Sequence, residues 1–262
     1  MKLSLSGRLW ETPQGYRAPL PEQIELARSL GYEGLEIRYP LLAAESEVFR
    51  IRELLETNRV EAALAFHAKV PRALEDWHDA MRLIHISKAL GVQFTRVAVF
   101  SIEELPSVRE LACRAADHGI VLLLHLHINT WCDRPARMLE AVEIVNHPNA
   151  GALFDPAHVR LAGGRDVAAA IRDLGSLIRF VNIQNMRPLD PGETEPQIKG
   201  YGGGWARAMP EDPAGLPLRE IIGLLHAAGY QGWLNVAAAV AESEDPRKVA
   251  LSYSAFLSTC AI

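Results

Sequence analysis

The sequence predicts an α/β protein, a single (β/α)8 TIM barrel domain over residues 1–262. Short, nearly continuous apolar runs alternate with longer segments of helical spacing, and this pair recurs eight times along the chain. Such alternation is typical of parallel strands that are buried on both faces and joined by right-handed crossovers. Eight pairs in a chain of 262 residues fit a closed barrel better than an open, doubly wound sheet.

The first half of the chain contains four of these strand and helix pairs. They are predicted at 2–6 and 21–30, 34–38 and 43–57, 60–67 and 73–90, and 94–100 and 103–118. Pro21 suits the first turn of a helix, where a backbone N–H would lack a partner in any case. Gly31, Gly91 and Gly119 each stand just after a predicted helix, where a glycine commonly ends it.

The second half repeats the pattern, with one long interruption. Its pairs are predicted at 120–127 and 134–146, 150–155 and 166–174, 178–185 and 216–229, and 232–238 and 245–259. The interruption is a loop rich in Pro and Gly, 186–215, and its stretch "GYGGG" follows no strand, so a dinucleotide site has little support. Barrels of this kind often form oligomers, and the loop around Trp205 is a candidate lid or contact in a homo-oligomer.

Composition and charge favour a small-molecule protein. The formal net charge is −5, which predicts neither nucleic-acid binding nor attachment to an anionic membrane. No segment offers the roughly eighteen apolar residues of a membrane span, and the N-terminus lacks a signal-peptide pattern, so we expect a cytoplasmic protein. Cys113, Cys132 and Cys260 form no C-x-x-C pair and are expected to be free thiols.

Polar side chains that close the predicted strands are the candidate site residues, because barrel enzymes place their chemistry at the carboxyl-terminal strand ends. These residues are Glu36, Arg38, His67, His125, His127, Asp155, His158, Asn182, Gln184, Asn185, Arg187 and Asn235. His125 and His127 lie two apart on one strand and therefore share a face, with Leu123 below them in the barrel. They could chelate a zinc-like ion, act in proton transfer, or be hydrogen-bonded histidines of a polar barrel mouth.

Four further residues are candidates for function, and each also has a structural interpretation. Asp155 and His158, in "FDPAH", bring a carboxylate and a titratable ring into the same mouth, although an aspartate here could simply cap a turn. Glu36 lies on the same strand face as Gly34 and Arg38, and this face is expected to point into the barrel. Glu36 then either has a functional role or forms a structural salt bridge. His67 is either a substrate contact or a core histidine.

Several segments together resemble a known family. They are "LARSLGYEGLEIR", "SKALGVQFTRV", "HGIVLLLHLH", "FDPAH" and "LLHAAGYQGWLNV". In order, and across essentially the whole chain, they resemble the xylose isomerase-like TIM barrels of the sugar isomerase, epimerase and inosose dehydratase group. The resemblance implies one divalent ion, which polarises a carbonyl or hydroxyl beside the carbon that loses its proton. It assigns Asp155 as the ligand from strand six, His158 as the histidine of D-x-x-H, and Arg187 as a substrate contact after strand seven.

The sequence also departs from the pattern that this resemblance implies. His125 stands where strand five often has glutamate, "NIQN" replaces H-x-K-D after strand seven, and Ala237 replaces the last glutamate. One aspartate gives too little negative charge for magnesium or manganese. A zinc-like ion could still use His125, His127 and Asp155; with no metal bound, the same residues and His158 could form an acid–base cluster.

We therefore expect a sugar or polyol isomerase, epimerase or dehydratase that abstracts a proton next to a carbonyl or hydroxyl carbon. The expected catalytic residues are Asp155, His158, His125 and His127, and the expected substrate contacts are Glu36, His67, Arg187, Gln184 and Asn182. The alternative is a catalytically inactive barrel that binds a sugar-like ligand or a protein partner, because Ala237 leaves no full metal cage. Endonuclease action has little support, since the chain lacks both the ligands and a basic excess.

Overall fold

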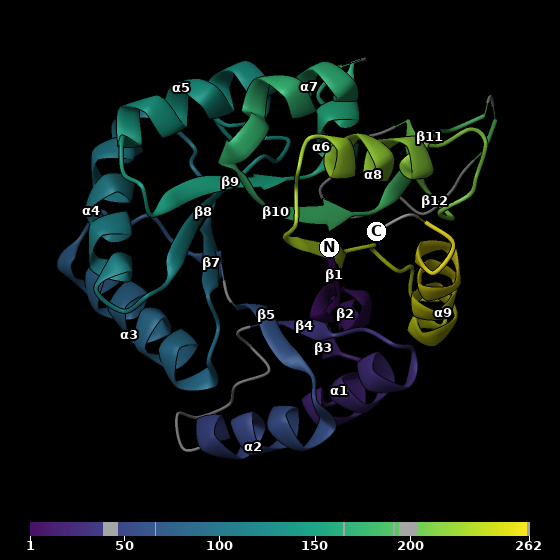
Figure 1. Ribbon diagram of the computed structural model, residues 1–262, viewed down its shortest axis with the longest axis horizontal. Helices are drawn as coiled ribbons and strands as arrows, with labels where there is room; N and C mark the ends of the chain where they lie inside the picture. The colour runs from purple at the N-terminus through teal and green to yellow at the C-terminus, as the bar shows by residue number, and fades with distance from the viewer. Residues whose placement is uncertain (39–46, 66, 165, 191, 194–203, 261–262) are drawn as a thin grey trace.

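The computed structural model shows a barrel of parallel strands inside a ring of helices, as the sequence predicts (Figure 1). It describes residues 1–262 except 39–46, 66, 165, 191, 194–203 and 261–262. The strands of the described barrel are β1 (Lys2–Ser6), β4 (Gly34–Ile37), β5 (Glu61–Ala65), β6 (His67–Ala68), β7 (Phe94–Val97), β8 (Val121–His125), β9 (Ala150–Phe154), β10 (Ile178–Ile183) and β13 (Trp233–Val236). Their order is β5-β4-β1-β13-β10-β9-β8-β7-β6, all parallel.

The two ends of that order meet and nearly close the barrel. β5 and β6 lie on either side of residue 66, and β5 packs beside β7, to which β6 is hydrogen-bonded. Counting β5 and β6 together, the described residues form the eight parallel strands that the repeated sequence pattern predicts.

The helices lie close to their predicted positions. They are α1 (Leu20–Ser29), α2 (Val48–Asn58), α3 (Leu74–Leu90), α4 (Leu105–Ala116), α5 (Pro135–Val145), α6 (Pro156–Leu161), α7 (Val167–Leu174), α8 (Leu218–Ala227) and α9 (Pro246–Leu257). Part of the second predicted helix, 43–46, falls outside the described residues. Helix α6 is not predicted by the sequence analysis, because six residues between a strand and a longer helix show no clear helical period.

The strands end earlier than their apolar runs. The run 94–100 predicts a seven-residue strand, but β7 ends at Val97. Beyond it, the carbonyl of Val99 accepts a hydrogen bond from the Trp131 N–H at 2.7 Å, outside the parallel ladder. The apolar pattern reports burial, and burial continues after the strand pairing has ended.

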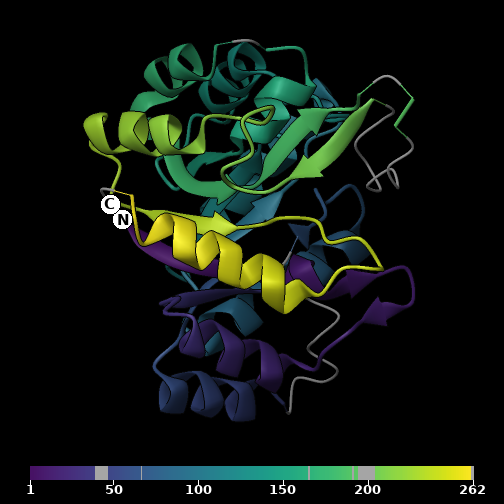
Figure 2. The same cartoon turned by 90° about the vertical axis from the view of Figure 1, so that its right-hand side faces the viewer.

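Two hairpins are added at one end of the barrel. β2 (Glu11–Thr12) pairs with β3 (Gly15–Tyr16), and β11 (Asn185–Pro188) pairs with β12 (Trp205–Ala208). Figure 2 shows both hairpins on the side away from the N-terminus, where the barrel strands have their carboxyl ends. The long loop predicted at 186–215 therefore contains an antiparallel ribbon, with Trp205 at the start of its second strand.

The core has two apolar layers, one inside the barrel and one between strands and helices. The inner layer consists of Ala63, Leu64, Leu123, Leu153, Phe180 and Trp233. Residues of opposite parity, such as Leu35 and Leu124, belong to the larger layer under the helices. Leu123 thus lies inside the barrel, as its parity with His125 predicts. None of the described helices is long and apolar enough to cross a membrane.

The absence of a side chain at Gly34 makes room for the Trp233 ring in the inner layer. A Cβ built on Gly34 would lie 2.8 Å from two Trp233 ring atoms and 3.0 Å from the Ala63 Cβ. We expect Gly34→Ala to lower the free energy of unfolding by about 1–3 kcal/mol through overpacking. Urea denaturation measures this change.

Gly223→Ala is the matched control, because a Cβ built there, on an exposed face of α8, meets no atom within 4 Å. It should raise the free energy of unfolding by up to about 1 kcal/mol through helix propensity. Equal effects of the two substitutions would contradict the packing explanation.

Candidate active site

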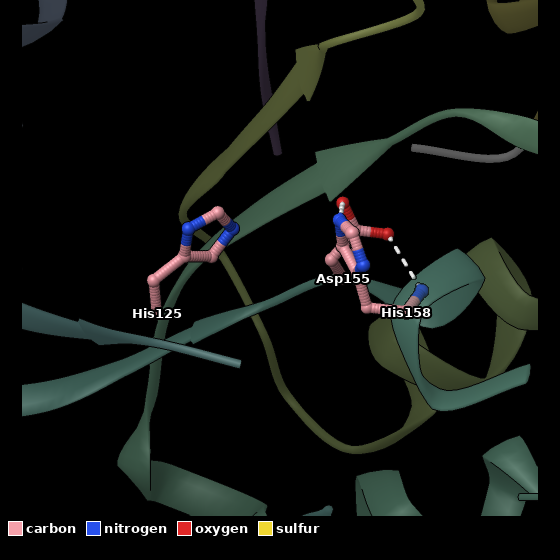
Figure 3. A group of neighbouring side chains, drawn as sticks. All are labelled: His125, Asp155 and His158. Atoms are coloured by element: carbon pink, nitrogen blue, oxygen red, sulfur yellow. Dashed lines mark hydrogen bonds and ion pairs between the residues drawn. The ribbon is translucent and has the colours of Figure 1, made fainter. Parts of the chain in front are cut away.

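His125, Asp155 and His158 come together at the carboxyl-terminal ends of β8 and β9. One ligand atom from each lies within 4.8 Å of those of the other two, and all three residues are buried. Figure 3 shows the His125 imidazole extending toward the other two side chains. His125 is the last residue of β8, and Asp155 directly follows β9, so parallel pairing of the two strands sets their separation.

Asp155 is held from two sides. Its Oδ1 accepts hydrogen bonds from the backbone N–H groups of Ala157 (3.0 Å) and His158 (3.3 Å), which makes it the N-cap of α6. Its Oδ2 accepts a bond of 2.6 Å from the Gln184 side-chain amide and lies 3.6 Å from Nε2 of His158. The capping role that the sequence left open is therefore present, and the second carboxylate oxygen still faces the histidine.

Burial raises the pKa of Asp155 to about 6, although the Gln184 hydrogen bond, the charge of Arg8 and the capping N–H groups all act to lower it. A carboxyl group with this pKa exchanges its proton close to neutral pH. Asp155 can therefore be a ligand or a proton carrier in the pH range where most enzymes work.

His127 and His158, two histidines near Asp155, are uncharged at neutral pH. Burial lowers the pKa of His158 well below its usual value, and burial lowers the pKa of His127 to about 4. The two rings lie 3.8 Å apart between centroids, so protonating one would disfavour protonating the other. A neutral imidazole is the form that binds a metal or accepts a proton.

His127 has a defined tautomer. Its Nδ1 lies 2.7 Å from the carbonyl oxygen of Ile128, and because a carbonyl only accepts, Nδ1 carries the proton. Its Nε2 therefore holds the lone pair. Unlike His125 and His158, His127 is partly exposed, so this nitrogen belongs to a ring that reaches solvent.

The sequence analysis expects a metal set of His125, His127 and Asp155, whereas the structure groups His158 with His125 and Asp155. The reason is helix α6. Asp155 is the N-cap of this helix, and one helical turn brings the side chain of His158, three residues later, next to it. His127, by contrast, lies beyond the end of β8.

Two imidazoles and one carboxylate suit an ion of the zinc class better than magnesium or manganese. Hard ions prefer several carboxylate oxygens, and among the described residues this group offers one carboxylate. Zinc binds well to neutral imidazole and tolerates three protein ligands with an open position. His125, Asp155 and His158 therefore fit the divalent ion that a barrel of this kind implies.

A second polar cluster occupies the other half of the barrel mouth, around Glu36. The Glu36 carboxylate pairs with Arg96 at 2.9 Å and Arg38 at 3.1 Å, and it accepts hydrogen bonds from Asn235 at 2.8 Å and from Ser6. Burial acts to raise the pKa of Glu36, but the two guanidinium groups and the hydrogen bonds outweigh it and lower the pKa to about 2. Glu36 thus points into the barrel, as its parity predicts, and forms the salt bridge that the sequence left as one interpretation.

The other residues predicted to contact the substrate differ in where the structure places them. Asn182 is buried and accepts a hydrogen bond from Asn235 at 2.9 Å, while Gln184 holds Asp155. Arg187, in β11, instead pairs with Glu193 through a bond of 2.7 Å and lies 3.8 Å from Asp212. The side chain of His67 lies outside the part of the structure that is described.

The sequence analysis does not include Arg96 and Arg8 among the candidate site residues, although their charges act on the histidines of the mouth. Arg96 lies in the apolar run "FTRVAVF", two residues after Phe94, whose ring packs edge-on against Phe180 inside the barrel at 5.7 Å. A charge at the inward parity of an apolar strand is the signal that would have identified it. Arg8 follows β1 in a 3-10 helix, Gly7–Trp10, and no sequence pattern marks it.

Comparison with known proteins agrees with the fold. The profile of the xylose isomerase-like TIM barrel family matches residues 24–257. No curated protein sequence matches the chain.

Three solved structures illustrate the structural similarity. A probable 3-DHS dehydratase, AsbF, from Bacillus anthracis has 17% identity and a TM-score of 0.76, covering 99% of both chains. IOLI protein with a zinc atom has 17% identity and a TM-score of 0.78, covering 97% of this chain and 96% of the other. D-psicose 3-epimerase with D-tagatose, from Clostridium cellulolyticum H10, has 16% identity and a TM-score of 0.71, covering 98% and 97%. At these identities the similarity establishes the fold.

A metal measurement tests the three-residue group. Protein purified without chelator should contain about one zinc-class ion per chain, and His158→Ala should lose most of it, because one of three protein ligands is removed. Plasma mass spectrometry gives the metal content. His226→Ala, on the exposed face of α8, is the control and should retain the ion. Wild-type protein without stoichiometric metal would contradict the assignment.

Replacing Glu36 tests the second cluster. Glu36→Gln should lower the free energy of unfolding by about 3–5 kcal/mol at neutral pH, because Arg96 loses its carboxylate partner in a buried site. Since folding lowers the pKa of Glu36 from 4.5 to about 2, its stabilising effect is complete above pH 4.5 and disappears as the pH falls toward 2.

The difference between wild type and Glu36→Gln should therefore shrink in acid, as measured by denaturant unfolding between pH 7 and pH 2.5. The exposed pair of Glu56 and Arg52 supplies a control, and Glu56→Gln should change stability by less than about 1 kcal/mol. A pH-independent difference would show that Glu36 is not ionised in the folded protein.

Proposed function

Because the chain belongs to the xylose isomerase-like TIM barrel family, we propose that it is a sugar or polyol isomerase, epimerase or dehydratase. It acts by removing a proton next to a carbonyl or hydroxyl carbon in the barrel mouth. The observation that carries this proposal is the convergence of His125, Asp155 and His158, buried at adjacent strand ends. Proteins with the same fold include a D-psicose 3-epimerase, an L-ribulose 3-epimerase and a probable 3-DHS dehydratase, which supports this range of reactions.

His125, Asp155 and His158 would hold a divalent ion of the zinc class. When bound, such an ion polarises a carbonyl or hydroxyl oxygen and makes the neighbouring C–H more acidic. Gln184 fixes the orientation of the Asp155 carboxylate through its 2.6 Å hydrogen bond. A zinc atom in the similar IOLI structure supports this assignment.

His127 is the proposed base. Its Nε2 holds a lone pair, and its ring touches the group from the partly exposed side. The C–H bond of the substrate breaks, the proton moves to Nε2, and the bonding electrons pass to the carbonyl oxygen. Return of a proton to the same carbon or its neighbour gives an epimer or an isomer, and loss of an adjacent hydroxyl as water gives a dehydrated product.

Asp155→Asn tests the proposal without disturbing the helix. An asparagine can still cap α6, so stability should change by less than about 1 kcal/mol. Proton exchange should fall by at least about a hundredfold, because the carboxylate is lost. The measurement is deuterium uptake from heavy water into a panel of ketoses, inososes and keto acids.

Asp166→Asn is the matched control, because Asp166 caps α7 through a bond of 2.7 Å to the Ala169 N–H and is not part of the group. It should retain the wild-type exchange rate. An Asp155→Asn rate equal to that of wild type would remove Asp155 from the mechanism.

A further inference from the structure

Gln184 lies at a corner where the chain leaves the barrel. It is the single residue between β10, which ends at Ile183, and β11, which begins at Asn185 in the antiparallel hairpin. Its side-chain amide donates the 2.6 Å hydrogen bond that orients the Asp155 carboxylate. The direction of this side chain therefore depends on how the backbone is held on both sides of the corner.

The barrel holds the first side of the corner. Ile183 pairs with Val236 of β13 in the parallel ladder, and its carbonyl accepts a hydrogen bond of 3.0 Å from the Ala237 N–H. On the second side, β11 belongs to a separate two-stranded sheet with β12. A connection other than barrel pairing must therefore tie the start of the hairpin to the rest of the protein.

The side chain of Asn185 supplies this connection. It is fully buried, and its two amide atoms bind different groups. Oδ1 accepts hydrogen bonds from the backbone N–H groups of Met186 at 2.9 Å and Leu216 at 2.7 Å. Nδ2 donates to the carbonyl of Met209 at 2.9 Å and, at 3.4 Å, to that of Leu216. One side chain thus links the first residue of the hairpin to the loop before α8.

Two other residues complete this anchor. The backbone N–H of Asn185 donates a bond of 2.9 Å to the hydroxyl of Tyr253, a fully buried residue of α9. Gly215 leaves room for the asparagine, because a Cβ built on it would lie 2.5 Å from Oδ1 and 2.6 Å from Nδ2 of Asn185. The start of the hairpin is therefore fixed both to α9 and to the loop before α8.

We infer that Asn185 is a positioning residue of the active site, which anchors the corner and so holds the Gln184 amide on the Asp155 carboxylate. The inference rests on the proposed function, in which Asp155 helps to bind the ion. None of the bonds described above joins Asn185 to His125, Asp155 or His158, so it acts on them through Gln184. A group that orients a metal-binding side chain typically contributes about ten- to a hundredfold to metal affinity or activity.

NMR on the metal-free protein tests the anchor. The side-chain amide signal of Gln184, assigned by its disappearance in Gln184→Ala, should exchange with solvent at least about tenfold more slowly than that of the exposed Gln14, because it is buried and hydrogen-bonded. Asn185→Ala should remove this protection. Protection equal to that of wild type in Asn185→Ala would overturn the inference.

Asn149→Ala is the matched control, because Asn149 also ties two segments together. Its Nδ2 donates to the carbonyls of Ala112 at 3.2 Å and Ile120 at 2.5 Å, and it directly precedes β9. This variant should lower the midpoint of urea unfolding, as Asn185→Ala does, but leave the Gln184 signal protected. Loss of protection in both variants would assign the effect to general destabilisation and overturn the inference.

Zinc titration of the double variant tests whether Asn185 acts through Gln184. Asn185→Ala and Gln184→Ala should each weaken zinc binding by at least about tenfold. The double variant should bind zinc no more weakly than Gln184→Ala alone, because both substitutions remove the same orienting bond. Losses that add in the double variant would contradict this route, and so would a Gln184→Ala variant with the affinity of wild type.

Gly215→Ala tests the anchor without replacing the asparagine, which matters if Asn185→Ala does not fold. The added methyl group displaces the Asn185 amide, so the Gln184 signal should lose its protection. Gly223→Ala, where a Cβ meets no atom within 4 Å, should keep it. A fully protected signal in Gly215→Ala would show that the position of the Asn185 amide does not matter to Gln184.

The two proposals fail in different measurements. A Gln184 signal whose protection depends on Asn185, in a wild-type protein that exchanges no substrate proton, would support the anchor and refute the proposed reaction. Deuterium exchange into substrate at the wild-type rate in Asn185→Ala would leave the reaction standing and refute the positioning role.

Discussion

The interior of the barrel gives buried charged groups little water, so a buried carboxylate there depends on partners from neighbouring strands and helices. This constraint shapes the whole mouth. Glu36 on β4 is bound by groups from β1, β7 and β13, and Asp155 is bound by the first turn of α6 and by Gln184 after β10. Below them, the apolar layer around Phe180 and Trp233 fills the barrel. The hydrogen bonds and ion pairs of Glu36 and Asp155 therefore connect strands that are distant in sequence.

Glu36 and Asp155 show how the same burial gives opposite chemistry. Both are almost fully buried, which disfavours the charged form of each. Two guanidinium groups overcome this for Glu36 and keep it ionised, whereas Asp155 has mainly neutral donors and titrates near neutrality. Glu36 is thus a fixed charge that holds the mouth together. Asp155 is a group that can exchange a proton or bind an ion.

Strand parity and the D-x-x-H pattern predicted much of this arrangement from the sequence. Parity placed Glu36 and Leu123 inside the barrel, and strand ends placed His125 and Asp155 in one mouth. The choice of His158 over His127 as the second histidine of the metal set depended on a six-residue helix too short to show a period. The position of Arg187 depended on a hairpin formed by segments seventeen residues apart (188 to 205), a non-local pairing that no local pattern encodes.

The charge balance connects the unusual ligand set with the substrate. A group with one carboxylate and two neutral imidazoles would offset only half of the charge of a divalent ion, so the occupied group would keep a net positive charge. An anionic group on a ligand would offset this charge in a mouth with little water, and a neutral sugar would not. The loss of carboxylate ligands, which first suggests an inactive barrel, is therefore equally consistent with a site adapted to a negatively charged substrate.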